Sequence, residues 1–471
     1  MLHQRLRILF GYLHLLYARV FAFVLPSTFH DTFRPIRHKL NKDRDFGRYI
    51  DKGPQALKVP QSINELERIV AQAFQEKQRL NICGSAHSSN GLTLSARSGF
   101  RLFLRELPVF FKMVTPDIVE CSATATVEQI GKFLAQHKKM LPVLGDQLDL
   151  TLGGYLSAGG IGYNSAEFGF LSDHVESLEL LTLTDGRVSC SKKKNPGIFH
   201  SVLGGQGQLG IILSAQIRVI DRKQVFLRSE IYILPAPPGL IDAIEHSFRL
   251  DFNYHFLTLI ISKNRPFLVN ICGKNKSDKS DLRSFNKTFN YIQGEKVFGI
   301  SQLVRCKLNR FTLPGGYNLQ AELTDFWLWS EYCVSFSAFK ELFEELVEIA
   351  KIDQSWLHVY PIRLAQGTSE YHSFLPYPEP CAEEEKQVVF GLAFTFHKKS
   401  QKDVTRIKDR LASLFERVTK LGGKPYYHGY HPKAANKTLQ QIYPMFDDFL
   451  ELKKKLDPDN LLNSDWLTKP Q

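Results

Sequence analysis

A loop of small residues is the first feature of this 471-residue chain that could bind a ligand. The loop runs from Gly84 to Gly91, follows a short apolar stretch and carries one imidazole, that of His87. Small side chains leave backbone amides exposed, and successive exposed amides can bind phosphate oxygens. The loop therefore predicts a phosphate-binding site. At this stage His87 is either a polar loop residue hydrogen-bonded to backbone or a functional side chain of that site.

Two glycine-rich runs follow, and a carboxylate precedes the first of them. Leu150–Gly162 holds five glycines in thirteen residues, and Leu203–Gly210 is the second run. Such runs usually mean that backbone lies against something that leaves no space for side chains. Asp146 could act as a base, because hydride leaves a C–H next to nitrogen more easily when a carboxylate removes the N–H proton. The alternative is that Asp146 caps a turn; Asp149 is interpreted as a turn residue in either case.

Several other motifs lack the context that their chemistry needs. Gly205–Gly210 matches G-x-G-x-x-G, but a β-type run follows it where a dinucleotide site requires a helix. The chain has no G-K-[ST] phosphate loop and no G-x-S-x-G elbow. His428 and His431 have no third ligand at a suitable spacing, so they are interpreted as loop histidines on a surface or pocket rim. No metal site is predicted.

Composition and charge exclude several classes of protein. Hydrophobic residues make up 43% and charged residues 23% of the chain, which is typical of folded globular proteins. The formal net charge is +12, but the basic residues are scattered, so we expect no nucleic-acid partner. The seven cysteines are widely spaced and include no C-x-x-C, which predicts neither a disulfide framework nor a zinc site.

The N-terminal segment from Ile8 to Leu25 is mostly apolar and precedes a proline. Its eighteen residues would rise about 27 Å as a helix, against a bilayer core of roughly 30 Å, and Arg19 lies within it. A membrane anchor, a signal peptide and a helix packed on the domain all remain open. Membrane association through residues 8–25 is the preferred interpretation, with a cytoplasmic protein as the alternative.

The remaining chain alternates strands and helices. Asn64–Lys77 has helical apolar spacing with Asn64 as its N-cap, and Thr126 caps a second helix that ends at His137. From Val225 to Thr419, strand-like stretches alternate with helical ones and indicate an α+β domain with a mainly antiparallel sheet. The tail from Tyr443 to Leu456 is an amphipathic helix.

Three segments in fixed order carry a resemblance to a known family. They are Gly84–Ser88, Asp146–Gly154 and Gly204–Ile212, and Lys453–Asn463 adds a closing segment. The chain resembles the flavoproteins of the p-cresol methylhydroxylase and vanillyl-alcohol oxidase type, most closely cytokinin dehydrogenase, while Gly422–His428 and Ser464–Trp466 are similar to decaprenylphosphoryl-ribose oxidase. The resemblance implies an α+β fold in which a two-lobed FAD-binding domain is joined to the α+β substrate domain. The boundaries are 1–48 for the apolar helix and basic linker, 49–222 for the FAD-binding domain, 223–420 for the substrate domain and 421–471 for a segment that returns to the FAD-binding domain.

The resemblance also implies roles for individual residues. FAD is the implied cofactor, and His87 occupies the position at which related members attach the flavin covalently. Two positions depart from the pattern: Ala86 stands where glycine is usual, and Asn81 where arginine is common. The implied FAD-binding residues are Cys83, Gly84, Ser85, Ala86, His87, Ser88, Thr151, Gly153, Gly154, Ser157, Gly160, Gly162, Gly207, Gly210, Ile211, Ile212 and Asn463.

The predicted function is that of an FAD-dependent oxidoreductase that transfers a hydride from a small-molecule substrate to the flavin. The resemblance gives Asp146 the role of base in oxidising a C–N bond of a cytokinin-like secondary amine. One alternative is oxidation of a sugar, alditol or lipid-linked sugar hydroxyl. Another is a membrane-associated, flavin-binding protein without turnover. The electron acceptor is oxygen or a quinone.

Overall fold

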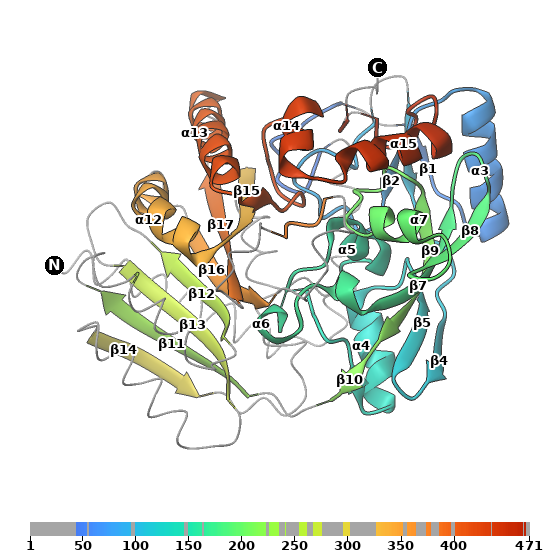
Figure 1. Ribbon diagram of the computed structural model, residues 1–471. Helices are drawn as coiled ribbons and strands as arrows, with labels where there is room; N and C mark the ends of the chain where they lie inside the picture. The colour runs from blue at the N-terminus through green and yellow to red at the C-terminus, as the bar shows by residue number, and fades with distance from the viewer. Residues whose placement is uncertain are drawn as a thin grey trace.

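The computed structural model describes most of the FAD-binding and C-terminal regions and parts of the middle of the chain. The described residues are 44–53, 56–95, 99–145, 149–162, 164–222, 226–234, 241, 254–260, 267–275, 295–301, 326–351, 356–363, 374–377, 386–396, 401–434, 436–464 and 466–467. Two bodies lie side by side, one a domain of short strands and helices and the other a large sheet with two helices (Figure 1).

The first lobe of the FAD-binding domain is a small parallel sheet covered by one helix. Its strands, in the order β1-β3-β2, are β1 (Ala56–Lys58), β3 (Phe100–Phe103) and β2 (Leu80–Cys83). Helix α3 (Ile63–Gln75) contributes buried Leu66, Val70 and Ala73 to the same core as Leu80. The predicted N-cap Asn64 is wrong: the N-cap is Ser62, two residues earlier, whose Oγ accepts a hydrogen bond from Glu65 N at 3.2 Å.

The second lobe is a five-stranded antiparallel sheet in the order β4-β5-β9-β7-β8. These strands are β4 (Phe111–Thr115), β5 (Ile118–Ser122), β9 (Ile211–Arg218), β7 (Val175–Leu181) and β8 (Arg187–Ser191). The lobe also contains α4 (Val127–Gln136), α5 (Leu152–Ala158), α6 (Ser165–Phe168), the 3-10 turn Leu171–His174, α7 (Pro196–Val202) and the pair β6 (Lys139–Met140) and β10 (Ile220–Asp221). Because β9 directly follows the glycines of 205–210, rejection of the dinucleotide motif is confirmed.

Helix α4 begins with a reciprocal cap that makes its stability testable. Thr126 Oγ1 accepts from Gln129 N at 3.2 Å, and Gln129 Oε1 accepts from Thr126 N at 2.8 Å. We expect Thr126→Ala to lower the free energy of unfolding by about 1 kcal/mol, since one of the first helical amides loses its acceptor. Chemical denaturation measures this. Thr126→Ser retains the hydroxyl and should retain most of the stability; an equal loss for both variants would contradict the cap.

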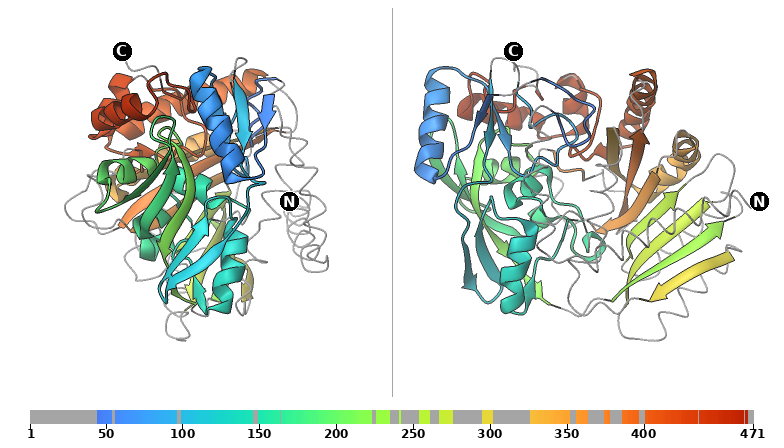
Figure 2. Two further views of the ribbon diagram at one scale, coloured as in Figure 1. Left: turned by 90° about the vertical axis from the view of Figure 1, so that its right-hand side faces the viewer. Right: turned by 180° about the vertical axis from the view of Figure 1, so that it is seen from behind.

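The second domain is built on an eight-stranded antiparallel sheet, which confirms the α+β fold and the predicted sheet type. Helix α12 (Phe336–Ala350) packs on β16 and β17, and α13 (Gln401–Lys420) on β15 and β18 (Figures 1 and 2). In sheet order the strands are β14 (Glu295–Ser301), β11 (Phe226–Leu234), β13 (Phe267–Asn275), β12 (Tyr254–Ile260), β16 (Trp356–Arg363), β17 (Lys386–Phe396), β15 (Phe326–Val334) and β18 (Lys424–Pro425).

The C-terminal segment contacts both domains. Its first strand, β18, pairs with β15 of the large sheet. Helices α14 (Asn436–Ile442) and α15 (Phe446–Leu456) follow, and Leu462 then forms a parallel bridge with Leu80 in β2. The end of the chain is therefore attached to the strand that leads into the small-residue loop.

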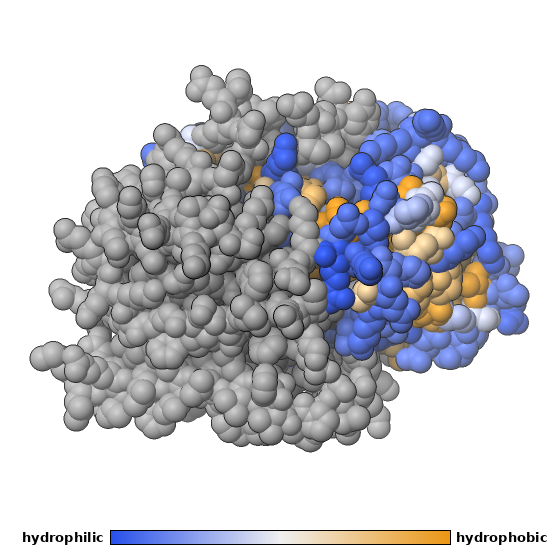
Figure 3. Space-filling view, turned by 90° about the horizontal axis from the view of Figure 1, so that it is seen from below, coloured by the Kyte–Doolittle hydropathy of each residue, from blue (hydrophilic) through white to orange (hydrophobic). Residues whose placement is uncertain are grey.

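The predicted apolar helix at 8–25 lies outside the described residues. Among the residues that are described, no helix is long and apolar enough to cross a bilayer. Exposed apolar side chains occur around β4, at Val109, Phe110 and Val114. The described face seen from below has apolar areas beside hydrophilic ones (Figure 3).

Candidate flavin site

The predicted phosphate-binding loop leaves β2 and lies against the start of the first glycine run. Ser85 Oγ donates a hydrogen bond to the carbonyl of Asp149. A Cβ atom on Gly84 would lie only 2.1 Å from Thr151 Oγ1. Within the described part of the chain, the amides of residues 84–88 donate no hydrogen bond. The loop is thus held by its side chains and carbonyls while its amides stay available for an anion.

Ala86 stands at a position where the backbone favours glycine. Its φ is +59°, in the left-handed region that costs an L side chain free energy. This explains why glycine is usual here in the family that the sequence resembles. In this chain alanine adopts this left-handed conformation.

The loop gives a direct prediction about cofactor retention. Gly84→Ala should reduce the flavin-to-protein absorbance ratio of purified protein by about tenfold or more, since the new Cβ must displace either Thr151 or the loop. Gly197→Ala is the matched control, because a Cβ there meets its nearest neighbour, Leu452, at 3.9 Å. An unchanged ratio for Gly84→Ala would show that the loop does not hold the cofactor.

His87 lies at the centre of these contacts. Its Nε2 is 3.0 Å from Asp149 Oδ1, and its ring packs against Phe46 at 4.9 Å between centroids. The contact with Asp149 is close but is not aligned as a hydrogen bond, so both imidazole nitrogens are buried without a hydrogen-bond partner in the described structure. His87 is therefore not the backbone-bonded loop residue that was the alternative interpretation.

Two segments distant in sequence cover the loop. From the N-terminal side, Phe46 N donates to Ser88 O at 3.1 Å and the Tyr49 hydroxyl donates to Ser89 O. From the C-terminal side, Ser89 N donates to His428 O at 3.0 Å. These contacts bring His428 close to the loop that carries His87.

The glycine runs pack mainly against the chain itself. Gly153 N donates to Ala123 O at 2.7 Å, and a Cβ on Gly162 would lie 2.0 Å from Leu144 O. Gly160 packs on Leu171 in the same way. Gly154 is different, because only Thr151 approaches its Cβ position, at 3.2 Å.

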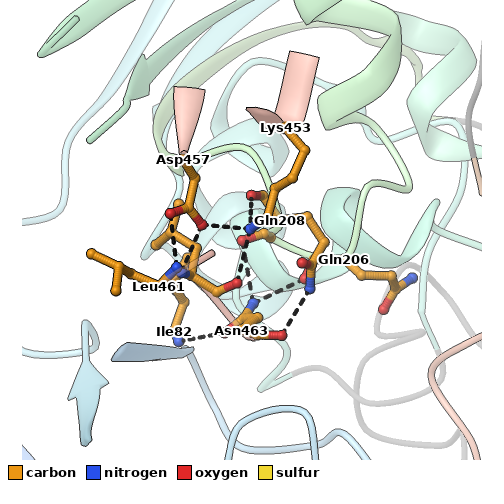
Figure 4. A network of polar contacts seen from close by, with 9 residues as sticks. Ile82, Gln206, Gln208, Lys453, Asp457, Leu461 and Asn463 are labelled. Atoms are coloured by element: carbon orange, nitrogen blue, oxygen red, sulfur yellow. Dashed lines mark hydrogen bonds and ion pairs between the residues drawn. The ribbon is translucent and has the colours of Figure 1, made fainter. Parts of the chain in front are cut away.

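The second run is a turn that joins several of the predicted residues. Gln206 N donates to Ser157 O at 2.9 Å, which holds the turn against α5. Gly207 lies next to Asn463, whose Nδ2 would be 2.7 Å from a Cβ. Asn463 Nδ2 donates to the carbonyls of Gln206 and Gly207, and its Oδ1 accepts from Ile82 N at 3.0 Å (Figure 4). Gly210, Ile211 and Ile212 lead into β9, where both isoleucines are buried.

A buried polar cluster lies on the substrate-domain side, and sequence reasoning missed it. Glu331 in β15 is 3% exposed and accepts hydrogen bonds from Trp329 Nε1 at 3.1 Å and from the Tyr360 hydroxyl. His428 Nδ1 lies 3.4 Å from Glu331 Oε2. Desolvation of the ring, helped by the neighbouring His87, lowers the pKa of His428 to about 4, although 36% of the side chain stays exposed. The imidazole is neutral near pH 7 and can accept a proton.

Two further predicted residues, Asp146 and His431, differ in where they lie. Asp146, the predicted base, lies outside the described residues. His431 is not a surface or rim histidine: it is buried, its Nε2 lies 2.9 Å from Tyr426 O, and burial lowers its pKa to about 3. Among the described residues, no group of three His, Cys, Asp or Glu side chains could hold a metal ion.

These features fit FAD. The loop amides, which donate to no backbone carbonyl of the described residues, suit the pyrophosphate, and the buried nitrogens of His87 lack the partner that a buried polar atom normally has. Residues 84–88 would hold the phosphates, while His87 would meet the isoalloxazine end.

Comparisons with known proteins agree with this geometry. Residues 54–191 match the family model described as FAD binding domain, and residues 320–470 match that of D-arabinono-1,4-lactone oxidase. L-Gulonolactone oxidase of Bos taurus is 23% identical over 440 residues, covering 88% of this chain and 95% of the relative. Cytokinin dehydrogenase 2 of Arabidopsis thaliana is 31% identical over 180 residues, covering 38% of this chain and 35% of the relative.

A further relative aligns only in part. An uncharacterized oxidoreductase from the fasciation locus of Rhodococcoides fascians is 29% identical over 182 residues, so this chain spans 41% of its length. The two family models that match this chain describe an FAD-binding domain and an oxidase domain. The chain is therefore an FAD-dependent oxidoreductase whose FAD-binding domain is of the p-cresol methylhydroxylase type.

Proposed function

We propose that this enzyme oxidises a hydroxyl-bearing carbon of a small sugar-derived substrate, such as a sugar lactone. The observation that carries the proposal is the match of residues 320–470, which span part of the substrate domain and the C-terminal segment, to the D-arabinono-1,4-lactone oxidase model. The alignment with L-gulonolactone oxidase also extends through both domains. The cytokinin dehydrogenase alignment covers 38% of the chain, so it supports the cofactor more than the substrate.

The buried cluster supports the chemistry of alcohol oxidation. Bound FAD supplies the acceptor for the hydride that leaves the substrate carbon. The chain must then accept the hydroxyl proton. His428 is neutral and can accept it, and the Glu331 carboxylate, 3.4 Å away, stabilises the imidazolium that results. Trp329 and Tyr360 hold Glu331 in place through their hydrogen bonds.

FAD attachment and electron transfer to oxygen complete the proposal. His87 is the residue through which the flavin is covalently bound, and its two unpartnered buried nitrogens support this role. Oxygen is the acceptor, in line with the oxidase names of the relatives. A quinone is the alternative acceptor. Membrane association through residues 8–25 stays a prediction, which sedimentation with and without the first 26 residues would test.

The test is anaerobic bleaching of the flavin, monitored by its visible absorption. Aldono-1,4-lactones and alditols should bleach it, and readmitted air should restore the colour and form hydrogen peroxide. Bleaching by N6-alkyl adenines alone would overturn the sugar proposal and favour the amine reaction with Asp146 as base. Reoxidation by a quinone but not by air would overturn oxygen as the acceptor.

A further inference from the structure

The imidazole of His87 is fixed in one orientation by residues on different segments. Phe46 packs on its ring with an interplanar angle of 44°, and Asp149 Oδ1 lies 3.0 Å from Nε2. Only 10% of the His87 side chain is exposed. Asp149 is itself anchored, because Ser85 Oγ donates to its carbonyl. The ring edge that carries Nε2 therefore faces a carboxylate, and the two nitrogens are not equivalent.

This asymmetry determines which nitrogen carries the hydrogen. A carboxylate oxygen beside a ring nitrogen repels a lone pair there and attracts an N–H group. Nε2 is therefore the protonated nitrogen of neutral His87, and Nδ1 keeps its lone pair. Nδ1 is buried and makes no hydrogen bond within the described structure. It is the nitrogen that remains available to form a bond.

We propose that Asp149 is a positioning residue for flavin attachment, holding His87 in the tautomer whose Nδ1 bonds to the flavin. The inference deepens the proposed function, because it rests on covalent attachment through His87. Residue 149 was interpreted from sequence as a turn residue, and this role follows only from its position beside Nε2.

Covalent attachment is an oxidation that removes two electrons, and dioxygen is the oxidant. An Nδ1–C bond forms to the 8-methyl carbon of the flavin, and one C–H bond of that methyl group breaks. The methyl proton leaves to solvent, and the Nε2 proton leaves by way of Asp149. The two electrons released reduce the flavin ring, and dioxygen then takes them to form hydrogen peroxide. The product is an alkylated, neutral imidazole on an oxidised flavin.

The experiment measures how fast acid-stable flavin forms. Protein produced under riboflavin limitation is given FAD in air, samples are precipitated with acid, and the flavin absorbance of each pellet is recorded. The wild-type pellet should become yellow. Asp149→Asn, which keeps the size but removes the charge, should bind FAD yet form acid-stable flavin about 100-fold more slowly. Asp117→Asn makes the same change at an exposed carboxylate that pairs with Lys139, and it should react at the wild-type rate.

The possible outcomes distinguish a failure of the role of Asp149 from a failure of covalent attachment or of the oxidoreductase function. Equal rates for wild type and Asp149→Asn would overturn the role of Asp149 and leave covalent attachment standing. A wild-type pellet without flavin, with the flavin in the supernatant, would overturn covalent attachment and this inference, but not the oxidoreductase. If Asp149→Asn does not fold, the formation of acid-stable flavin is compared in Asp149→Glu and Asp149→Gln. Attachment only in Asp149→Glu would support the role of the carboxylate, and equal attachment in both variants would overturn it.

Discussion

Glu331→Gln should lower the rate of flavin reduction by substrate about 10²–10⁴-fold while FAD stays bound. Glu331 is buried in β15, where Trp329 and Tyr360 donate to its two carboxylate oxygens. Glutamine keeps the shape but loses the negative charge next to His428, so the imidazolium formed on proton transfer is no longer stabilised. Anaerobic stopped-flow measurement of flavin reduction with the sugar lactone checks the prediction.

A neighbour on the same strand provides the control. Ser330 is fully buried and bonds to the Tyr332 hydroxyl at 3.2 Å, on the opposite face of β15. Ser330→Ala should affect stability but leave the rate of flavin reduction within about twofold of wild type, since it does not touch the cluster. Equal slowing by Ser330→Ala and Glu331→Gln would mean that strand distortion, and not the carboxylate, sets the rate.

The pKa of His428 adds a pH signature to the same reaction. Since His428 must be neutral to accept a proton, flavin reduction should fall as the pH drops through about 4. Above that pH, this group alone gives no further rise in rate. A fall centred near the ordinary histidine pKa would show that the proton acceptor is a different group.

The features that sequence predicted best are those set by local backbone constraints. The loop at 84–88 and the glycine runs could be found because glycine and small residues are required wherever backbone segments approach closely. Gly84 against Thr151 and Gly162 against Leu144 are such contacts. The antiparallel sheet of the second domain was visible as β-rich stretches that alternate with helical ones.

The cluster around Glu331 could not be assembled from sequence, because its members are far apart along the chain. Glu331 and Tyr360 lie on strands β15 and β16, and His428 follows β18. Tyr426 N donates to Glu331 O at 2.8 Å, which pairs the two segments and brings His428 alongside. One signal was available: Glu331 is the single charged residue in the strand Phe326–Val334, where a buried carboxylate needs partners.

Asp149 lies in a turn, as the sequence predicted, but the contact of its side chain with His87 could not be predicted. A carboxylate in a short loop between apolar segments is typical of a turn, and no local pattern shows what its side chain faces. The contact with His87 depends on β2 and α5 lying next to each other in space. Roles of this kind follow from the tertiary structure alone.

Lys453→Met should destabilise the FAD-binding domain by about 3–5 kcal/mol. Lys453 is 1% exposed and donates to Asp457 Oδ2 at 2.5 Å and to the carbonyls of Gln208 and Leu462, at 2.8 and 3.0 Å (Figure 4). Methionine fills the space but leaves the Asp457 carboxylate buried without its cation, and burial alone already lowers the pKa of Lys453. Urea unfolding monitored by flavin fluorescence measures the loss.

The ion pair between Lys453 and Asp457 also holds the C-terminal segment in place. Asp457 also accepts from Leu461 N and Leu462 N at 2.7 and 2.8 Å, so it holds the C-terminal segment that Asn463 ties to Ile82 and the glycine turn. The double variant Lys453→Met/Asp457→Asn removes both charges and should recover part of the loss, because asparagine can still accept one amide. Lys454→Met alters an exposed neighbour and should be neutral. The single variants Lys453→Met and Asp457→Asn are measured beside the double variant. If the double variant lost as much unfolding free energy as the two single variants together, the two side chains would act independently, and the stabilisation would come from the backbone contacts of each.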